Sequence, residues 1–202
     1  MPRLVQAIRS ARTPVLLLAV GLMISACGVN TIPTLDEQAK AKWSDVQNQY
    51  QRRADLIPNL VETVKGYATQ EREVLTQVIE ARAKATQVKV DASTVTDPSK
   101  FKEYQEAQNA LTGALGRLLV TVERYPDLKS NQNFLALQSQ LEGTENRIAV
   151  ARRDYIEAVR AYNTELKTVP GVIWASTLYR SYKPMETFSA PTDAQRAPTV
   201  KF

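Results

Sequence analysis

The polar side chains that could do chemistry in this 202-residue sequence fall on two stretches with helical spacing. Their carboxylates are candidates for acid–base work, and their amide and guanidinium groups are candidates for binding. The spacing does not demand catalysis, because long helices carry such residues on their solvated faces. We therefore expect no catalytic residue and interpret the set as a structural or interaction cluster. The cluster consists of Arg53, Asp55, Asn59, Glu62, Glu145, Asn146, Arg147, Arg152 and Asn163.

Arg53 differs from the other members because it lies on an apolar stripe together with Ile57 and Leu60. A buried guanidinium group is costly unless a carboxylate or several other acceptors surround it. We expect Arg53 to pair with Glu142 or Glu145 and thereby to fix the register of two helices. The alternative is that Arg53 extends along its aliphatic stem and places its charge in solvent.

The composition excludes several kinds of site. The sequence contains no histidine and a single cysteine. These absences remove the commonest general base and metal ligand, and they exclude an intrachain disulfide and a thiol–histidine pair. Beyond residue 26 the chain keeps 23 basic side chains (26 less three arginines) against 21 acidic ones, which is not the charge pattern of a nucleic-acid-binding protein. We expect no metal, no cofactor and no nucleic acid.

Residues 1–26 have the three-part pattern of a bacterial signal peptide. A positively charged start is followed by an apolar run from Pro14 to Met23 and then by small residues. Residues 24–27, ISAC, resemble the lipobox of bacterial lipoproteins, in which the cysteine is acylated and becomes the new N-terminus. We therefore expect a lipoprotein with acyl chains such as palmitate on Cys27. The apolar run is short for a spanning helix, which needs about 20 residues; the alternative is an uncleaved transmembrane segment.

The anchor sets the expected location in the bacterial cell envelope. Two or three acyl chains hold a protein stably at a membrane, whereas one chain binds only marginally. Gly28 rather than aspartate follows the cysteine, and the enterobacterial sorting rule then predicts the outer membrane, facing the periplasm. In an organism without an outer membrane, the expected location is the outer face of the cytoplasmic membrane. Residues 27–33 form the lipidated cysteine and a linker of at most about 20 Å.

The expected folded domain, residues 34–183, begins with a long apolar stripe at helical spacing. Thr34 and Glu37 form a predicted capping box at its start. Pro58 interrupts the stripe, either as a kink in a continuing helix or in the first turn of a new helix capped by Asp55. We expect helix along the whole stripe. The stripe consists of Trp43, Val46, Tyr50, Arg53, Ile57, Leu60, Val64, Tyr67, Glu71, Val74, Val78, Ala81, Ala85 and Val88.

Two further long helices are predicted after a turn-rich loop over residues 90–99. The first of them carries an apolar stripe from Phe101 to Tyr125. Gly113 and Gly116 lie beside that stripe, and we interpret them as sites of close approach between helices rather than as a hinge. The second carries a stripe from Phe134 to Val169 and ends before a Pro-Gly pair.

The expected fold class is all-α. Long amphipathic segments with short connections predict an elongated, antiparallel up-and-down bundle of about four helices, with the long first helix kinked or broken near Pro58. Residues 171–183 are expected as a short helix over one end of the bundle, or alternatively as a segment at a membrane interface, where tryptophan and tyrosine collect. Residues 184–202, punctuated by proline, are expected as an extended or disordered tail.

The assembled motifs resemble the LemA family. The resemblance covers about Ile32 to Phe188 and implies a bundle of about four helices displayed outside the inner membrane on an N-terminal segment. No enzymatic chemistry is established for this family as a class. Many members carry a plain transmembrane anchor, whereas this sequence has a lipobox. The motifs are RRADLIPNLVETVKGYA (52–68), ALGRLLVTVERYPDLKSNQNFLALQSQLEGTENRIAVARRDYIEAVRAYN (114–163), VPGV (169–172) and YKP (182–184).

The sequence favours a non-enzymatic scaffold or adaptor for other envelope proteins, anchored to the membrane at its N-terminus. One alternative is a lipid-binding or membrane-remodelling module. A further alternative is an envelope enzyme, but the sequence contains no histidine, no set of metal ligands and no nucleophile motif that would support it. The expected partners are the membrane and other envelope proteins, with a homo-oligomer as another option.

Overall fold

The computed structural model describes residues 28–88, 90–91 and 93–189, and all regular structure within them is helical, which confirms the all-α prediction. The signal peptide, Cys27 and residues 190–202 lie outside the described residues. The long helices are α2 (Thr31–Tyr67), α3 (Arg72–Gln87), α4 (Pro98–Val122) and α6 (Gln132–Glu165), and the short ones are α5 (Pro126–Lys129) and α7 (Gly171–Thr177).

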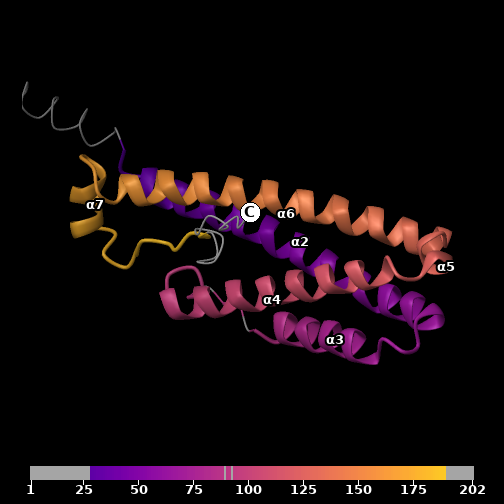
Figure 1. The fold of residues 1–202 in the computed structure, drawn as a ribbon. Coiled ribbons are helices and arrows are strands. Elements are labelled where there is room, and N and C mark those ends of the chain that lie inside the picture. The colour runs from indigo at the N-terminus through magenta and orange to yellow at the C-terminus, as the bar shows by residue number, and fades with distance from the viewer. Residues whose placement is uncertain (1–27, 89, 92, 190–202) are drawn as a thin grey trace, which may run out of the picture.

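The four long helices form two pairs. Helices α2 and α6 lie side by side along their length, and α3 packs against α4 (Figure 1). The chain runs out along α2, returns along α3, runs out again along α4 and returns along α6 (Figure 1). With 37 residues, α2 is about 55 Å long, so the bundle is elongated. We call the end with α7 and the start of α2 the proximal end, and the end with α5 and the α2–α3 turn the distal end.

Helix α2 begins three residues earlier than predicted. It starts at Thr31, and Ile32 is already fully buried, so the expected linker over residues 27–33 is wrong beyond Asn30. The predicted capping box does not form, because the Thr34 hydroxyl donates to the Asn30 carbonyl at 2.8 Å. Gly28 precedes the helix with a φ of 104°, a left-handed conformation that favours glycine.

Helix α2 continues through Pro58 and is not broken there. Proline lacks the N–H group that would bond to the carbonyl four residues earlier, which belongs to Ala54. The side chain of Arg82, on α3, donates to this carbonyl through Nε at 2.8 Å. Asp55 does not cap a new helix; it accepts a hydrogen bond from Gln51. A neighbouring helix thus supplies the donor that Pro58 removes.

The chain reverses at residues 68–71, so the prediction of continuous helix to Val88 is wrong. Apolar residues on both sides of this turn, including Val64 and Leu75, pack into the same core. Both helices therefore show the same spacing of three and four, and the periodicity conceals the turn. Glu71 fastens the turn to the end of α4, because it accepts hydrogen bonds from Tyr125 at 2.8 Å and Arg124 at 2.9 Å.

Two apolar clusters fill the bundle. The distal cluster joins α2, α3, α4, α5 and the start of α6. The proximal cluster is rich in aromatic rings and joins the first half of α2, the start of α4 and the second half of α6. Its rings lie 5.0–6.4 Å apart, in the range of favourable aromatic pairs. These rings belong to Trp43, Tyr50, Phe101, Tyr104, Tyr155 and Phe188.

The tail from Pro184 was expected as extended or disordered; residues 184–189 carry no helix or strand, but they are ordered. This segment, which we call the strap, packs against the bundle and buries Met185 and Phe188. It was missed because its contacts are made with residues far away in the sequence. The short helix expected over residues 171–183 forms at the end of the bundle, but only over Gly171–Thr177.

The interpretation of Gly113 and Gly116 as sites of close helix approach is also wrong. Both residues are exposed. A Cβ atom at position 116 would meet nothing within 4 Å, and one at position 113 would meet only the flexible end of Arg117 at 3.9 Å.

Replacing Gly113 or Gly116 by alanine should therefore raise the free energy of unfolding by about 0.5–1 kcal/mol each, because glycine loses more backbone entropy on folding. Urea denaturation of the full chain measures this change. Gly171→Ala is the control and should be destabilising, because its Cβ would lie 2.1 Å from the Glu165 carbonyl oxygen. A loss of stability in Gly116→Ala would show that another helix approaches position 116 closely after all.

Candidate functional site

Arg53 is the most completely buried charged side chain among the described residues, with 1% of its surface exposed. Its Nη1 donates to Glu145 Oε1 at 2.9 Å and to Thr112 Oγ1 at 2.8 Å. Its Nη2 donates to Gln108 Oε1 at 2.7 Å. The guanidinium group also lies 5.0 Å from the ring centre of Tyr50, a cation–π distance.

This network, which we call the Arg53 layer (Arg53, Gln108, Thr112 and Glu145), joins all four long helices. Gln108 completes the connection by donating to the Ala85 carbonyl of α3 at 3.2 Å. The layer separates the distal cluster from the proximal cluster. The predicted pairing of Arg53 with Glu145 is confirmed, and the alternative of a solvent-exposed charge is wrong.

The Arg53 layer holds the helices together and does not have the features of a ligand-binding or catalytic site. The cavity beside it, lined by Tyr50, Tyr104 and Gln108 among others, has a volume of about 120 Å³, whereas ligand pockets typically hold about 300–1,000 Å³. Burial raises the pKa of Tyr50 and of Tyr104 above the usual value, so both phenols stay protonated at neutral pH and are not bases.

Three other members of the predicted cluster lie on the exposed side of α2. Asp55, Asn59 and Glu62 all face solvent. Asn59 and Glu62 line a groove with residues of α6 near the distal end. We call this the distal groove; it is lined by Asn59, Glu62, Thr63, Asn133, Ala136, Leu137 and Gln140.

Asn146 and Arg147 belong to a different place on the surface. They line a second groove between α2 and α6, together with Asp45, Gln49 and Asp154. The structure therefore does not bring the predicted cluster together as one site. The shared helical spacing put its members on two helices, but their side chains point in several directions around each helix.

Arg152 and Asn163 hold the strap. The Arg152 guanidinium lies 4.4 Å from the ring centre of Phe188. Asn163 makes two hydrogen bonds to the backbone of Met185, donating to its carbonyl at 2.8 Å and accepting from its N–H at 2.9 Å. Both residues therefore have a structural role here.

Two buried tyrosines also bind the backbone of this segment. Tyr155 donates to the Glu186 carbonyl at 2.8 Å, and Tyr162 donates to the Lys183 carbonyl at 3.0 Å. Burial raises the pKa of both phenols, which keeps them protonated as donors.

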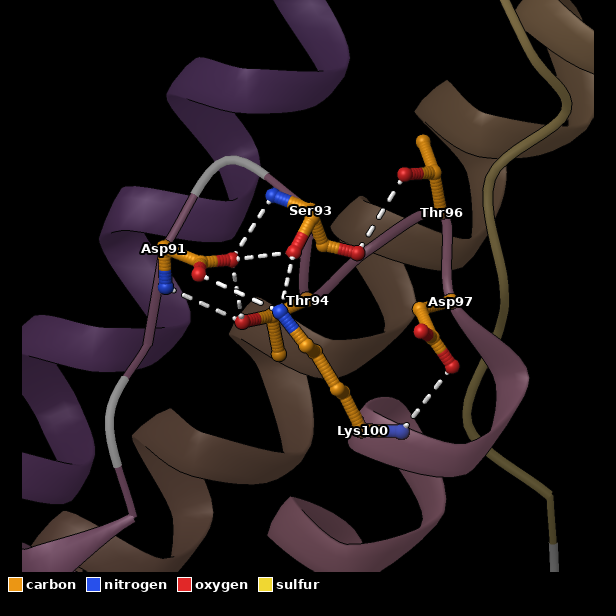
Figure 2. A network of polar contacts seen from close by, with 6 residues as sticks. All are labelled: Asp91, Ser93, Thr94, Thr96, Asp97 and Lys100. Atoms are coloured by element: carbon orange, nitrogen blue, oxygen red, sulfur yellow. Dashed lines mark hydrogen bonds and ion pairs between the residues drawn. The ribbon is translucent and has the colours of Figure 1, made fainter.

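The loop before α4 carries a second polar network, shown in Figure 2. Asp91 accepts hydrogen bonds from the Ser93 backbone at 2.8 Å and its hydroxyl at 2.6 Å, and it pairs with Lys100 at 3.3 Å (Figure 2). The hydrogen bond from the Ser93 side chain, followed by that from Lys100, lowers the pKa of Asp91 to about 2. Asp97 caps α4, because its side chain accepts hydrogen bonds from the backbone N–H groups of Ser99 and Lys100.

This loop network is internally neutralised, because the Lys100 ammonium group already occupies the position between Asp91 and Ser93. The described residues contain no group of three or more acidic or cysteine side chains placed to hold a metal ion. The loop instead supports the strap: the Val95 carbonyl accepts a hydrogen bond from the Glu186 N–H at 2.7 Å.

The model of the LemA family matches residues 42–202. The chain belongs to the LemA family. This finding confirms the resemblance, and the matched region contains the Arg53 layer, the loop network and the strap.

Curated relatives show moderate similarity to this LemA-family chain. Magnetosome protein MamQ 2 of Paramagnetospirillum magneticum is 27% identical over 157 residues, which cover 70% of this chain and 58% of the relative. Magnetosome protein MamQ of Magnetospirillum gryphiswaldense is 25% identical over 186 residues, covering 80% of this chain and 68% of the relative. Protein LemA of Metamycoplasma hominis is 25% identical over 123 residues, covering 61% and 52%. Some of these relatives are therefore matched over little more than half of their length.

Among the helices that the structure describes, none is both long enough and apolar enough to span a bilayer. The predicted lipidation site, Cys27, lies just before the first described residue.

The main contributors that sequence reasoning missed are Gln108, Thr112, Arg82 and Phe188. Gln108 left a signal, because it is a polar residue inside an otherwise apolar stripe. Arg82 left no signal, because its acceptor, the Ala54 carbonyl, lies on another helix and lacks its usual backbone donor only because of Pro58. Phe188 was hidden among prolines at the end of the chain.

A double-mutant cycle with Arg53→Ala and Glu145→Ala should give a coupling energy of about 1.5–3 kcal/mol, as for hydrogen bonds to charged groups. The free energy of unfolding of the four proteins measures it. Lys42 and Asp154 provide a matched control, because they also link α2 to α6 at 3.6 Å and the acid is similarly exposed, but the cation is 43% exposed instead of 1%. Their coupling should be about 0.2–1 kcal/mol. Equal coupling in the two pairs would contradict a special role for the Arg53 layer.

Proposed function

We propose that this LemA-family protein is associated with the bacterial cell envelope and serves there as a non-enzymatic scaffold or adaptor for other envelope proteins. The observation that carries the proposal is that the most deeply buried charge, Arg53, bonds to neighbouring helices. Arg53 is surrounded by acceptors from neighbouring helices, and the cavity beside it is too small for a typical ligand. The polar chemistry of the interior thus serves to hold the helices together.

The lipobox supports an anchor at the proximal end. Acylation of Cys27 would attach the chain to lipid one residue before Gly28, and α2 begins only three residues later. Such a short connection would hold the proximal end close to the membrane surface. Under the proposal, the lipid is inserted in the outer membrane of a Gram-negative organism and the folded bundle faces the periplasm.

The relatives support a structural role. MamQ proteins are named as magnetosome proteins, a name that refers to a structure and not to a reaction. This chain spans 58% of the length of the P. magneticum relatives, and its own partners are a matter for experiment.

The distal groove is the part of the bundle best placed to meet a protein partner. Its lining mixes polar side chains of α2 and α6, such as Asn59, Glu62 and Gln140, with Ala136 and Leu137, and it lies far from the proximal end. A mixed, solvated surface of this kind suits non-obligate protein contacts, which are no more apolar than the rest of a protein surface.

Photo-crosslinking in living cells tests the proposal. A photoreactive amino acid at Asn59, Glu62 or Asn133 should capture one recurring envelope protein, identified by mass spectrometry. Matched control positions are Lys102 and Glu106, which are exposed on α4 outside the groove. They should not capture that protein. In the Cys27→Ala variant the captured protein should be lost, because the bundle is no longer held at the membrane.

Two outcomes would contradict the scaffold proposal. If the groove positions yield only links between copies of this chain, the protein is a homo-oligomeric element. If groove and control positions capture the same mixture of proteins, the groove has no specific partner.

A further inference from the structure

Exposed large apolar side chains are concentrated around α7. Four of the nine found among the described residues lie within ten residues of sequence, whereas the other five are spread over α2, α3, α4 and α6. Helix α7 packs Trp174 and Ala175 partly against the proximal cluster, whereas Val172 and Ile173 on the helix and Val169 and Leu178 at its two ends are exposed. Clusters of exposed apolar side chains mark docking surfaces for proteins or membranes. The four are Val169 (77% exposed), Val172 (39%), Ile173 (50%) and Leu178 (64%).

The same segment is positively charged. Residues 166–185 contain Lys167, Arg180 and Lys183 but no aspartate or glutamate. None of the ion pairs within the described part of the chain involves these three side chains. Their charges are therefore available to an anionic surface.

The segment also lies next to the point where the N-terminal anchor would join the bundle. A Cβ atom at Gly28 would come within 3.3 Å of Pro170 Cγ, so the first described residue lies beside the N-cap residue of α7. Figure 1 shows α7 beside the start of α2. Cys27 directly precedes Gly28, and an anchor there would keep this segment at high effective concentration near lipid.

We propose that the α7 surface, formed by Val169, Val172, Ile173 and Leu178 with the flanking cations Lys167, Arg180 and Lys183, docks onto a bilayer that contains anionic lipids. The inference rests on the anchor of the proposed function. Lipid is favoured over a protein partner because exposed aliphatic side chains and cations outside any ion pair occur together at the anchored end. Interfacial segments combine basic residues with apolar side chains in this way.

Docking at α7 has a consequence for the whole bundle. An acylated cysteine alone is a flexible tether that leaves the body free to tilt. A second contact at the same end would hold α2 and α6 away from the membrane plane and keep the distal groove open to partners. The apolar side chains need only enter the boundary between headgroups and acyl chains, about 5–10 Å deep.

Quenching of tryptophan fluorescence by brominated lipids tests the α7 surface. The full chain is purified in detergent and reconstituted into vesicles of phosphatidylcholine and phosphatidylglycerol with brominated acyl chains. Trp174 should be quenched, whereas Trp43, only 6% exposed inside the aromatic cluster, should not. The Trp174→Phe variant isolates the Trp43 signal. The wild type should therefore be quenched and this variant should not, because shallow insertion brings α7, but not the interior of the bundle, to the brominated chains.

Paired variants provide the control. Ile173→Ser/Leu178→Ser should abolish the additional quenching, whereas Ile79→Ser/Val120→Ser should retain it. The second pair replaces apolar side chains of similar exposure on α3 and α4. Vesicles of phosphatidylcholine alone should give weaker quenching, since the cations then lose their anionic partner.

The outcomes separate the α7 surface from the anchor. The mass of the N-terminal peptide shows whether Cys27 is acylated, independently of fluorescence. If Cys27 is acylated and Trp174 is not quenched, the proposed docking of the α7 surface is contradicted, whereas the proposed lipid anchor is supported. Quenching without acylation would support the α7 surface and remove the lipid anchor. Absence of quenching together with crosslinks between α7 segments of two copies would also overturn the inference, in favour of a dimer contact.

Discussion

The arrangement of the bundle depends on the neutralisation of one buried guanidinium group. Arg53 is almost fully removed from solvent, and such a charge is costly unless hydrogen-bonded acceptors surround it. Glu145 comes from α6 and both Gln108 and Thr112 come from α4, while Gln108 also reaches the Ala85 carbonyl of α3. These bonds can form together in only one register of the four helices, so the charge selects that register.

The apolar clusters on either side of the Arg53 layer supply most of the buried surface but little of this selectivity. Repeating leucine, valine and alanine positions can pack in more than one register, whereas a polar layer cannot. The bond from Arg82 to the Ala54 carbonyl adds a second fixed point, because it fills the gap that Pro58 leaves. Since the polar groups of the interior are used in this way, the partners that we propose would bind at the outer faces or the two ends.

The sequence was sufficient for features that depend on local spacing. The all-α class follows from helical periodicity, and the cost of a buried charge predicts that Arg53 pairs with Glu142 or Glu145; the structure shows Glu145. The turn at residues 68–71 could not be seen, because the apolar spacing has the same phase on both sides of it. The strap could not be seen either, since Phe188 is held by residues that are distant in the sequence and lies among prolines that indicate disorder. The residues of the predicted polar cluster lie at several separate places, because spacing along a helix does not determine which neighbouring residue a side chain contacts.

Native-state hydrogen exchange on the full chain tests most directly whether the Arg53 layer joins the four helices into one cooperative unit. Buried amides of α3 and α6 near the layer should open with the same free energy, equal to that of global unfolding. Arg53→Met should lower this free energy equally in both helices. If the amides of α3 exchange through a much less costly opening than those of α6 in the unmodified protein, the helices are independent units and the Arg53 layer does not join them.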